Sequence, residues 1–145
     1  MTLGEAELAV RRLIARFANS LDAKAWDELG ECLAAAVYVD FSEPQGRLPE
    51  EVSRREFIDA RRTALEHVQT QHLTGNVEIY INGTSATARL SAMILRRREG
   101  EPTSKTHCQF LLGFECREQS WAICSIVQRV LWSDPAGSAE HSENA

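Results

Sequence analysis

The sequence has 145 residues, of which 43% are hydrophobic and 26% are charged, and its formal net charge at pH 7 is −5. This length and composition fit one globular domain and exclude a disordered or fibrous chain. The negative charge gives no general attraction to a phosphate backbone, so nucleic acid is not expected as a partner.

The first residues do not form the uninterrupted apolar stretch of a signal peptide, because charged side chains recur every few positions. No segment approaches the ~20 apolar residues that cross a bilayer. We therefore expect a cytoplasmic protein without membrane contact. The four cysteines have no C-x-x-C spacing and are expected to stay reduced, as small buried apolar residues.

Helices are predicted in the first half of the chain. Apolar residues recur at helical spacing between Leu8 and Leu21, and a second, shorter helix is predicted over residues 25–35. Ser53 and Glu56 have the spacing of a capping box, so a third helix is predicted to begin there.

The second half of the chain alternates apolar and polar residues with a period of two, which predicts strands. The alternation starts near Gln71, and Asn82-Gly83 is typical of a tight hairpin turn. An earlier strand is predicted over residues 37–41, followed by a polar loop over residues 42–49. Long strands are predicted over three further segments: residues 86–97, 105–115 and 121–132.

Helices followed by an antiparallel meander indicate an α+β domain over residues 1–133. We expect a cone-shaped, curved antiparallel sheet wrapped around about three N-terminal helices, with a pocket between the sheet and the helices. An open two-layer sandwich fits the same local patterns. Residues 134–145 lack core side chains and are expected to form a disordered tail.

Three titratable residues stand where the core pattern predicts apolar side chains: Asp22, His72 and His107. A carboxylate bonded to one histidine nitrogen fixes the tautomer and raises the basicity of the other nitrogen, which suits proton transfer. Each residue also fits a structural role, since Asp22 can cap the second helix and the histidines can be satisfied strand residues. His67, which follows a helix end, is interpreted as structural.

The one basic run, Arg96-Arg97-Arg98, is followed by acidic residues and is interpreted as a solvated strand end rather than an anion site. The aspartate and the two histidines would also make a metal-ligand set, but no short ligand spacing supports one, so no metal is expected. Glycine-rich nucleotide-binding motifs are absent, so no cofactor is expected.

The segment 17–29 resembles the first helix hairpin of the scytalone dehydratases and SnoaL-like proteins. The resemblance implies the cone-shaped fold of the nuclear-transport-factor-like proteins. It also implies that Asp22, His72 and His107 line the pocket, as an aspartate and two histidines do in the dehydratases. The likeness continues through further motifs: Val39-Asp40-Phe41, Gln71-His72, Asn82-Gly83, His107 and Arg129 to Trp132.

What the dehydratase resemblance implies for chemistry is general acid–base catalysis, which is worth roughly a hundred- to ten-thousandfold in rate. One histidine would move a proton from a carbon next to a carbonyl group and help to expel a β-hydroxyl group as water, while the aspartate orients it. The tyrosines that hold a water on the substrate carbonyl in the dehydratases correspond here to Leu21 and Phe41. Polarisation of the carbonyl would then fall to Tyr38, Asn19 or Gln109, and the same naphthol-type substrate is not expected.

We therefore predict a cofactor-independent lyase or cyclase that dehydrates, isomerises or cyclises a small hydrophobic, oxygenated, polyketide-like or steroid-like compound. A non-catalytic small-molecule-binding protein of the same fold is the alternative. Epoxide hydrolysis is a third interpretation, for which Asp22, Asp40 and Arg89 are a poor match in spacing. A homo-oligomer is expected, because the family often covers its sheet by self-association. The expected substrate-binding residues, most of which also fit a plain core, are Phe17, Leu21, Tyr38, Phe41, Met93, Gln109 and Phe110.

Overall fold

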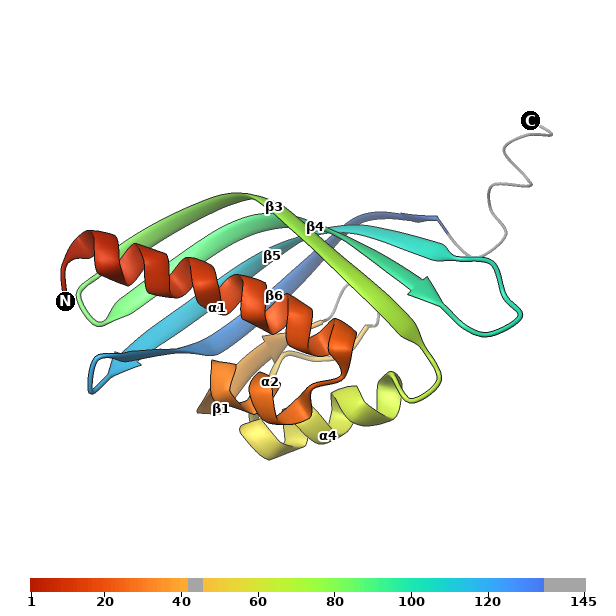
Figure 1. Ribbon diagram of the computed structural model, residues 1–145, viewed down its shortest axis with the longest axis horizontal. Coiled ribbons are helices and arrows are strands. Elements are labelled where there is room, and N and C mark those ends of the chain that lie inside the picture. Colours follow the sequence, from red (N-terminus) through yellow and green to blue (C-terminus); the bar gives the residue numbers. More distant parts are fainter. Residues whose placement is uncertain (42–45, 135–145) are drawn as a thin grey trace.

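The computed structural model describes residues 1–41 and 46–134 of the chain. In Figure 1, α1 lies along one face of a curved sheet, while α2 and α4 lie together beside β1. The helices are α1 (Leu3–Ala23), α2 (Trp26–Cys32) and α4 (Arg54–Ala64). The strands are β1 (Leu33–Asp40), β2 (Glu50–Ser53), β3 (Gln69–Asn82), β4 (Ser85–Arg97), β5 (Ser104–Arg117) and β6 (Ser120–Asp134).

The strands form one open sheet in the order β2-β1-β6-β5-β4-β3. Strands β3 to β6 pair antiparallel as a meander, whereas β1 pairs parallel with β6 and antiparallel with β2. The sequence predicts a wholly antiparallel sheet, and the sheet is mixed because the long connection between β1 and β6 lets these neighbours run in the same direction. Three helices packed against a curved sheet confirm the predicted α+β class.

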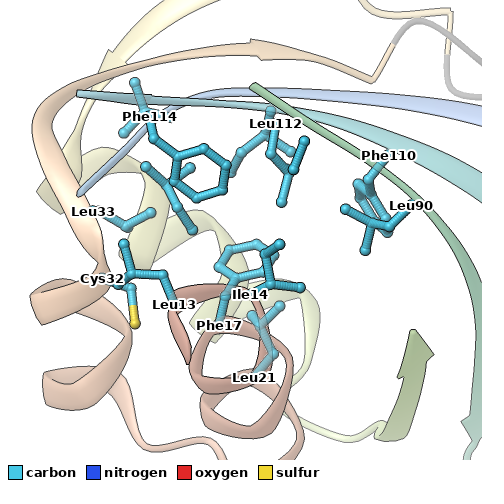
Figure 2. Close-up of a cluster of buried hydrophobic side chains, with 14 of the residues drawn as sticks. Leu13, Ile14, Phe17, Leu21, Cys32, Leu33, Leu90, Phe110, Leu112 and Phe114 are labelled. Carbon is cyan, nitrogen blue, oxygen red and sulfur yellow. The ribbon is translucent and has the colours of Figure 1, made fainter. Parts of the chain in front are cut away.

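Helix α1 begins with a complete capping box, in which Thr2 and Glu5 exchange side-chain-to-amide hydrogen bonds of 2.8 and 3.1 Å. The helix ends at Ala23, and Lys24 caps it with a left-handed backbone conformation (φ 54°). Its buried stripe faces the concave side of the sheet. Figure 2 shows this core, with Leu13, Ile14, Phe17 and Leu21 of the helix and Leu90, Phe110, Leu112 and Phe114 of the strands.

The boundary between α2 and β1 differs from the prediction. The sequence predicts a helix through residue 35, whereas α2 ends at Cys32 and β1 begins at Leu33. Leu33 pairs with Ile123 of β6, and its carbonyl group accepts a hydrogen bond from Arg54 Nε at 3.1 Å. These tertiary contacts outweigh the helix propensity of the alanines that follow, which is only a weak local preference.

Strand β2 was not predicted from the sequence, and it pairs Val52 with Val37 of β1. Its last residue, Ser53, caps α4 by accepting a hydrogen bond from the Glu56 amide at 3.1 Å. This contact confirms the predicted start of the third helix. Residues 42–45 of the predicted loop lie outside the described residues.

The meander follows the predicted turns. Gly83 has a φ of 61°, as a tight turn between β3 and β4 requires. Strand β6 continues to Asp134, beyond its predicted end at residue 132. The remainder of the predicted tail, residues 135–145, lies outside the described part of the chain. None of the described helices is long and apolar enough to cross a membrane.

Candidate active site

Asp22 lies in the last turn of α1 and connects this helix to β3. Its carboxylate accepts hydrogen bonds from the Thr70 hydroxyl group at 2.9 Å, from the His72 amide at 2.8 Å and from Nδ1 of the His72 ring at 2.6 Å. The Asp22 side chain is 20% exposed and the His72 side chain 11% exposed. The structure thus brings together two of the three titratable residues that the sequence singled out.

The position of Asp22 is unfavourable for a carboxylate, because the C-terminal end of a helix carries partial negative charge. The three donors offset this cost and hold both carboxylate oxygens in place. Helix α2 gains no cap from Asp22, since its N-cap is Ala25, which makes no side-chain cap bond. The interpretation of Asp22 as a cap for the second helix is therefore wrong.

The hydrogen bond to Asp22 determines the tautomer of His72. An ionised carboxylate only accepts hydrogen bonds, so the ring nitrogen that faces it, Nδ1, carries the proton. Nε2 is then the basic nitrogen, and no described residue forms a hydrogen bond with it. Every fully buried side-chain nitrogen or oxygen of the described residues has a hydrogen-bond partner. Nε2 has none and therefore keeps contact with solvent.

The pKa of His72 lies below its ordinary value. Burial lowers this pKa and outweighs the hydrogen bond and the negative charge of Asp22, which raise it. The guanidinium groups of Arg96 and Arg61 lower it further. The ring is therefore neutral at pH 7 and has an unprotonated nitrogen that can accept a proton.

A cavity of about 770 Å³ lies between the end of α4 and the turn that joins β4 to β5. Arg61 of α4 and Arg96 of β4 are among the residues that line it. Arg96 pairs with Thr70 of β3, and His72 pairs with Ile94, so the side chains of Arg96 and His72 share one face of the sheet. Neither Asp22 nor His72 lines the cavity itself, but the two arginines that line it, Arg61 and Arg96, both act on the charge of the His72 ring, so the pair lies next to the cavity wall.

The interpretation of Arg96-Arg97-Arg98 as a solvated strand end is wrong for Arg96. Burial lowers the pKa of Arg96, whose side chain is half-buried in the cavity wall, whereas Arg97 and Arg98 reach the cavity from exposed positions. Strand alternation explains the difference, because Arg96 continues the buried face of Ala92 and Ile94. The apolar alternation before the basic run was the signal that could have shown this.

His107 lies on the opposite face of the sheet from His72. The side chains of His72, Ile94 and Thr106 share the concave face, because these residues pair across three adjacent strands. His107 is the next residue along β5, so its side chain points to the convex face. The three titratable residues therefore do not converge, and the structure assembles the aspartate with one histidine only.

The surroundings of His107 are those of a surface residue. Its ring stacks on Trp132, with the ring centroids 4.2 Å apart, and its Nε2 lies 3.9 Å from Asp134 Oδ2. The sequence contained a signal for this placement. The apolar residues Cys108 and Phe110 mark the buried face of the strand. His107 is offset from them by one residue, so its side chain points to the opposite face.

The residues expected to bind the substrate divide between the two faces of the sheet. Phe17, Leu21 and Phe110 are buried in the core. Phe41 is half-buried beneath the Arg61 guanidinium group, whose carbon lies 5.6 Å from the ring centroid. The other three lie on the convex face, away from the site, because their strand neighbours on both sides are buried: Tyr38, Met93 and Gln109.

The alternative set for epoxide hydrolysis is not assembled. Asp40 forms an ion pair with Arg129 at 3.3 Å, and Arg89 pairs across strands with Glu78. Asp22 makes its hydrogen bonds to β3 instead. Within residues 1–41 and 46–134, no group of three or more histidine, cysteine, aspartate or glutamate side chains is placed to hold a metal ion.

Both the sequence and the fold match known proteins. The family model for the SnoaL-like domain matches residues 4–127. The structure is similar to that of the Kfla4162 protein from Kribbella flavida, with 16% sequence identity and a TM-score of 0.88. That alignment covers 96% of this chain and 99% of the other.

Two further solved structures share the fold. A candidate scytalone dehydratase from Novosphingobium aromaticivorans has 16% identity and a TM-score of 0.77, over 88% of this chain and 85% of its own. The hexachlorocyclohexane dehydrochlorinase LinA-type3 from Novosphingobium barchaimii has 9% identity and a TM-score of 0.76, over 92% and 91%. No curated protein gives a significant sequence match. At these identities the likeness to solved structures establishes the fold alone.

Proposed function

The chain belongs to the SnoaL-like domain family, and we propose that it is a cofactor-independent lyase or isomerase in which His72, held by Asp22, is the general base. The family match confirms the resemblance that the first helix hairpin indicated. The main support for this proposal is the protonation state of the His72 ring. This largely buried ring is neutral, gives its Nδ1 proton to a carboxylate and leaves Nε2 without a partner in the described part of the chain.

The chemistry begins at a carbon next to a carbonyl group of the substrate. Nε2 of His72 takes a proton from this carbon, and the electrons of the C–H bond form an enolate. The carboxylate of Asp22 stabilises the resulting imidazolium ring, because a negative charge 2.6 Å from Nδ1 favours the charged form. In a dehydration the enolate then expels a β-hydroxyl group, which takes the Nε2 proton and leaves as water. The ring ends the cycle neutral.

One histidine serves for both proton transfers in this scheme. The second histidine expected from the resemblance, His107, lies on the opposite face of the sheet. Isomerisation would return the proton to another carbon, and an aldol-type cyclisation would use the enolate as the nucleophile. All three reactions share the first proton transfer, for which general base catalysis is worth roughly a hundred- to ten-thousandfold.

The names of two proteins with the same fold support this class of reaction. Dehydration and dehydrochlorination each remove a proton from one carbon and a leaving group from the next. We propose an elimination or a related enolate reaction for this chain, on a small, oxygenated, polyketide-like or steroid-like compound. The volume of the cavity beside His72, about 770 Å³, suits a compound of this size.

The test is hydrogen exchange into two simple ketones, 2-tetralone and 3-benzoylpropionate, in D₂O. We expect the protein to accelerate deuterium uptake at the carbons next to the ketone, as followed by NMR. His72→Gln and Asp22→Asn should each slow this uptake about a hundredfold, because each removes part of the general base.

His107→Gln is the matched control and should keep the exchange rate of the unmodified protein, because its ring lies on the other face of the sheet. Thermal unfolding monitored by circular dichroism verifies that each variant is folded. An exchange rate that does not depend on His72 contradicts the proposal. Binding of the ketones without exchange would favour the alternative, a non-catalytic small-molecule-binding protein.

A further inference from the structure

Two arginine side chains in the cavity have no carboxylate partner among the described residues. Arg61 comes from the last turn of α4 and Arg96 from the end of β4, and both line the cavity beside His72. Arg61 lies over the face of Phe41, 5.6 Å from the ring centroid. No described residue forms an ion pair with either guanidinium group.

This arrangement is electrostatically costly. Burial lowers the pKa of both guanidinium groups, and the charges of Arg96 and Arg47 lower that of Arg61 further. Both side chains are half-buried, and a charge that loses part of its hydration without gaining a partner is destabilised. Two like charges that share one cavity are therefore stabilised when an anion enters it.

The carboxylates that line the cavity do not supply this anion. Asp59 faces Arg55, with 3.9 Å between their side-chain atoms, and Glu101 is exposed at the turn between β4 and β5. Arg47 already has an ion-pair partner, Glu50, at 3.5 Å. The charged residues of the cavity are mostly basic: Arg47, Arg61, Arg96, Arg97 and Arg98 against Asp59 and Glu101.

The two arginines are close enough to the general base to share a ligand with it. Arg96 and His72 lie on the same face of adjacent strands. His72 pairs with Ile94, and Arg96 is two residues further along β4, so the two side chains are diagonal neighbours. The charges of both Arg96 and Arg61 act on the His72 ring. An anionic group held by the arginines would therefore leave the neighbouring carbons of the ligand near Nε2.

We propose that Arg61 and Arg96 bind a carboxylate group of the substrate, so that the enzyme acts on a small organic acid with an apolar body. The guanidinium fork matches a carboxylate with two parallel hydrogen bonds, which a neutral ketone does not offer. The inference rests on the proposed function, since it specifies the substrate of the same site. It adds a requirement for negative charge to the oxygenated, apolar substrate expected from the family.

The experiment compares 3-benzoylpropionate with its neutral primary amide, which has almost the same shape. Calorimetric titration of the full chain should show the carboxylate binding about tenfold more tightly than the amide, or better. The variant Arg61→Met/Arg96→Met should lose this preference, since it keeps the apolar stems and removes both charges. Arg96→Lys should retain only part of it, because lysine keeps the charge and lacks the fork.

The matched control is Arg89→Met, an exposed residue of the same strand as Arg96 that does not line the cavity. This variant should keep the preference for the carboxylate. Equal affinity for the carboxylate and the amide, or no saturable binding of the carboxylate below about 10 mM, overturns the inference. So does a preference that survives in the double variant.

Asp22→Asn separates this inference from the proposed function. The variant should lose deuterium exchange and still prefer the carboxylate, because it leaves both arginines in place. If the unmodified protein shows the preference but no exchange, the anion site stands and the catalytic proposal fails. If it shows exchange without the preference, the catalytic proposal stands and the substrate is not an acid.

Discussion

The carboxylate of Asp22 holds both the backbone and the ring of His72. The hydrogen bond from the His72 amide places the residue, and the bond from Nδ1 sets its tautomer. The Thr70 hydroxyl group adds a third donor to the same carboxylate. A single substitution at Asp22 therefore changes the orientation, the tautomer and the pKa of the base together, which is why the exchange experiment uses it.

Sequence reasoning at the scale of residues found Asp22 and His72, because both are polar residues in positions where the pattern favours the core. It placed His107 with them on the same pattern and on the family resemblance, whereas the alternation along β5 puts this side chain on the other face. It interpreted Arg96 as solvated and did not single out Arg61, since the position of both in one cavity depends on the packing of α4 against the sheet. A contact between residues this far apart in the sequence has no local sequence pattern from which it could be predicted.

At the scale of elements, strand alternation decides which side chains can reach the site. Leu112 of β5 is 3% exposed and lies on the concave face, whereas its neighbour Leu111 is 42% exposed on the convex face. We predict that Leu112→Ala lowers the free energy of unfolding by about 2–5 kcal/mol, because it leaves a cavity in the core. Leu111→Ala should cost far less.

Urea denaturation of both variants tests this pair. Similar losses for Leu111→Ala and Leu112→Ala would contradict the assignment of faces, and with it the separation of His107 from the site. The comparison is internally controlled, since both substitutions remove the same atoms from adjacent positions of one strand.

The elements themselves were largely predictable, because period-two alternation, the Asn82-Gly83 turn and the Ser53 cap are local signals. The boundary at Leu33 and the strand β2 were not, because both depend on pairing with distant segments. The parallel pairing of β1 with β6 was not predictable from the sequence either. It follows from the path of the whole chain and has no local signature.

At the scale of the whole molecule, the convex face of the sheet carries exposed apolar side chains. Tyr80 is 75% exposed, Trp132 55% and Leu111 42%. We expect this face to be covered by a second copy of the chain, as the sequence analysis proposed, because exposed apolar side chains favour association. Sedimentation equilibrium should show an oligomer, and Leu111→Glu should shift it toward the monomer. A monomer at every concentration would contradict this expectation.

The central claim, that His72 is a neutral base held by Asp22, is tested most directly by nitrogen-15 NMR of the histidine rings across a pH titration. We predict that at pH 7 Nδ1 of His72 is protonated and Nε2 is not, with a titration midpoint below the ordinary value of 6.5. In Asp22→Asn the midpoint should fall further, because Asp22 raises the pKa of the ring. A proton on Nε2 at pH 7, or a midpoint above 6.5 in the unmodified protein, would contradict the account.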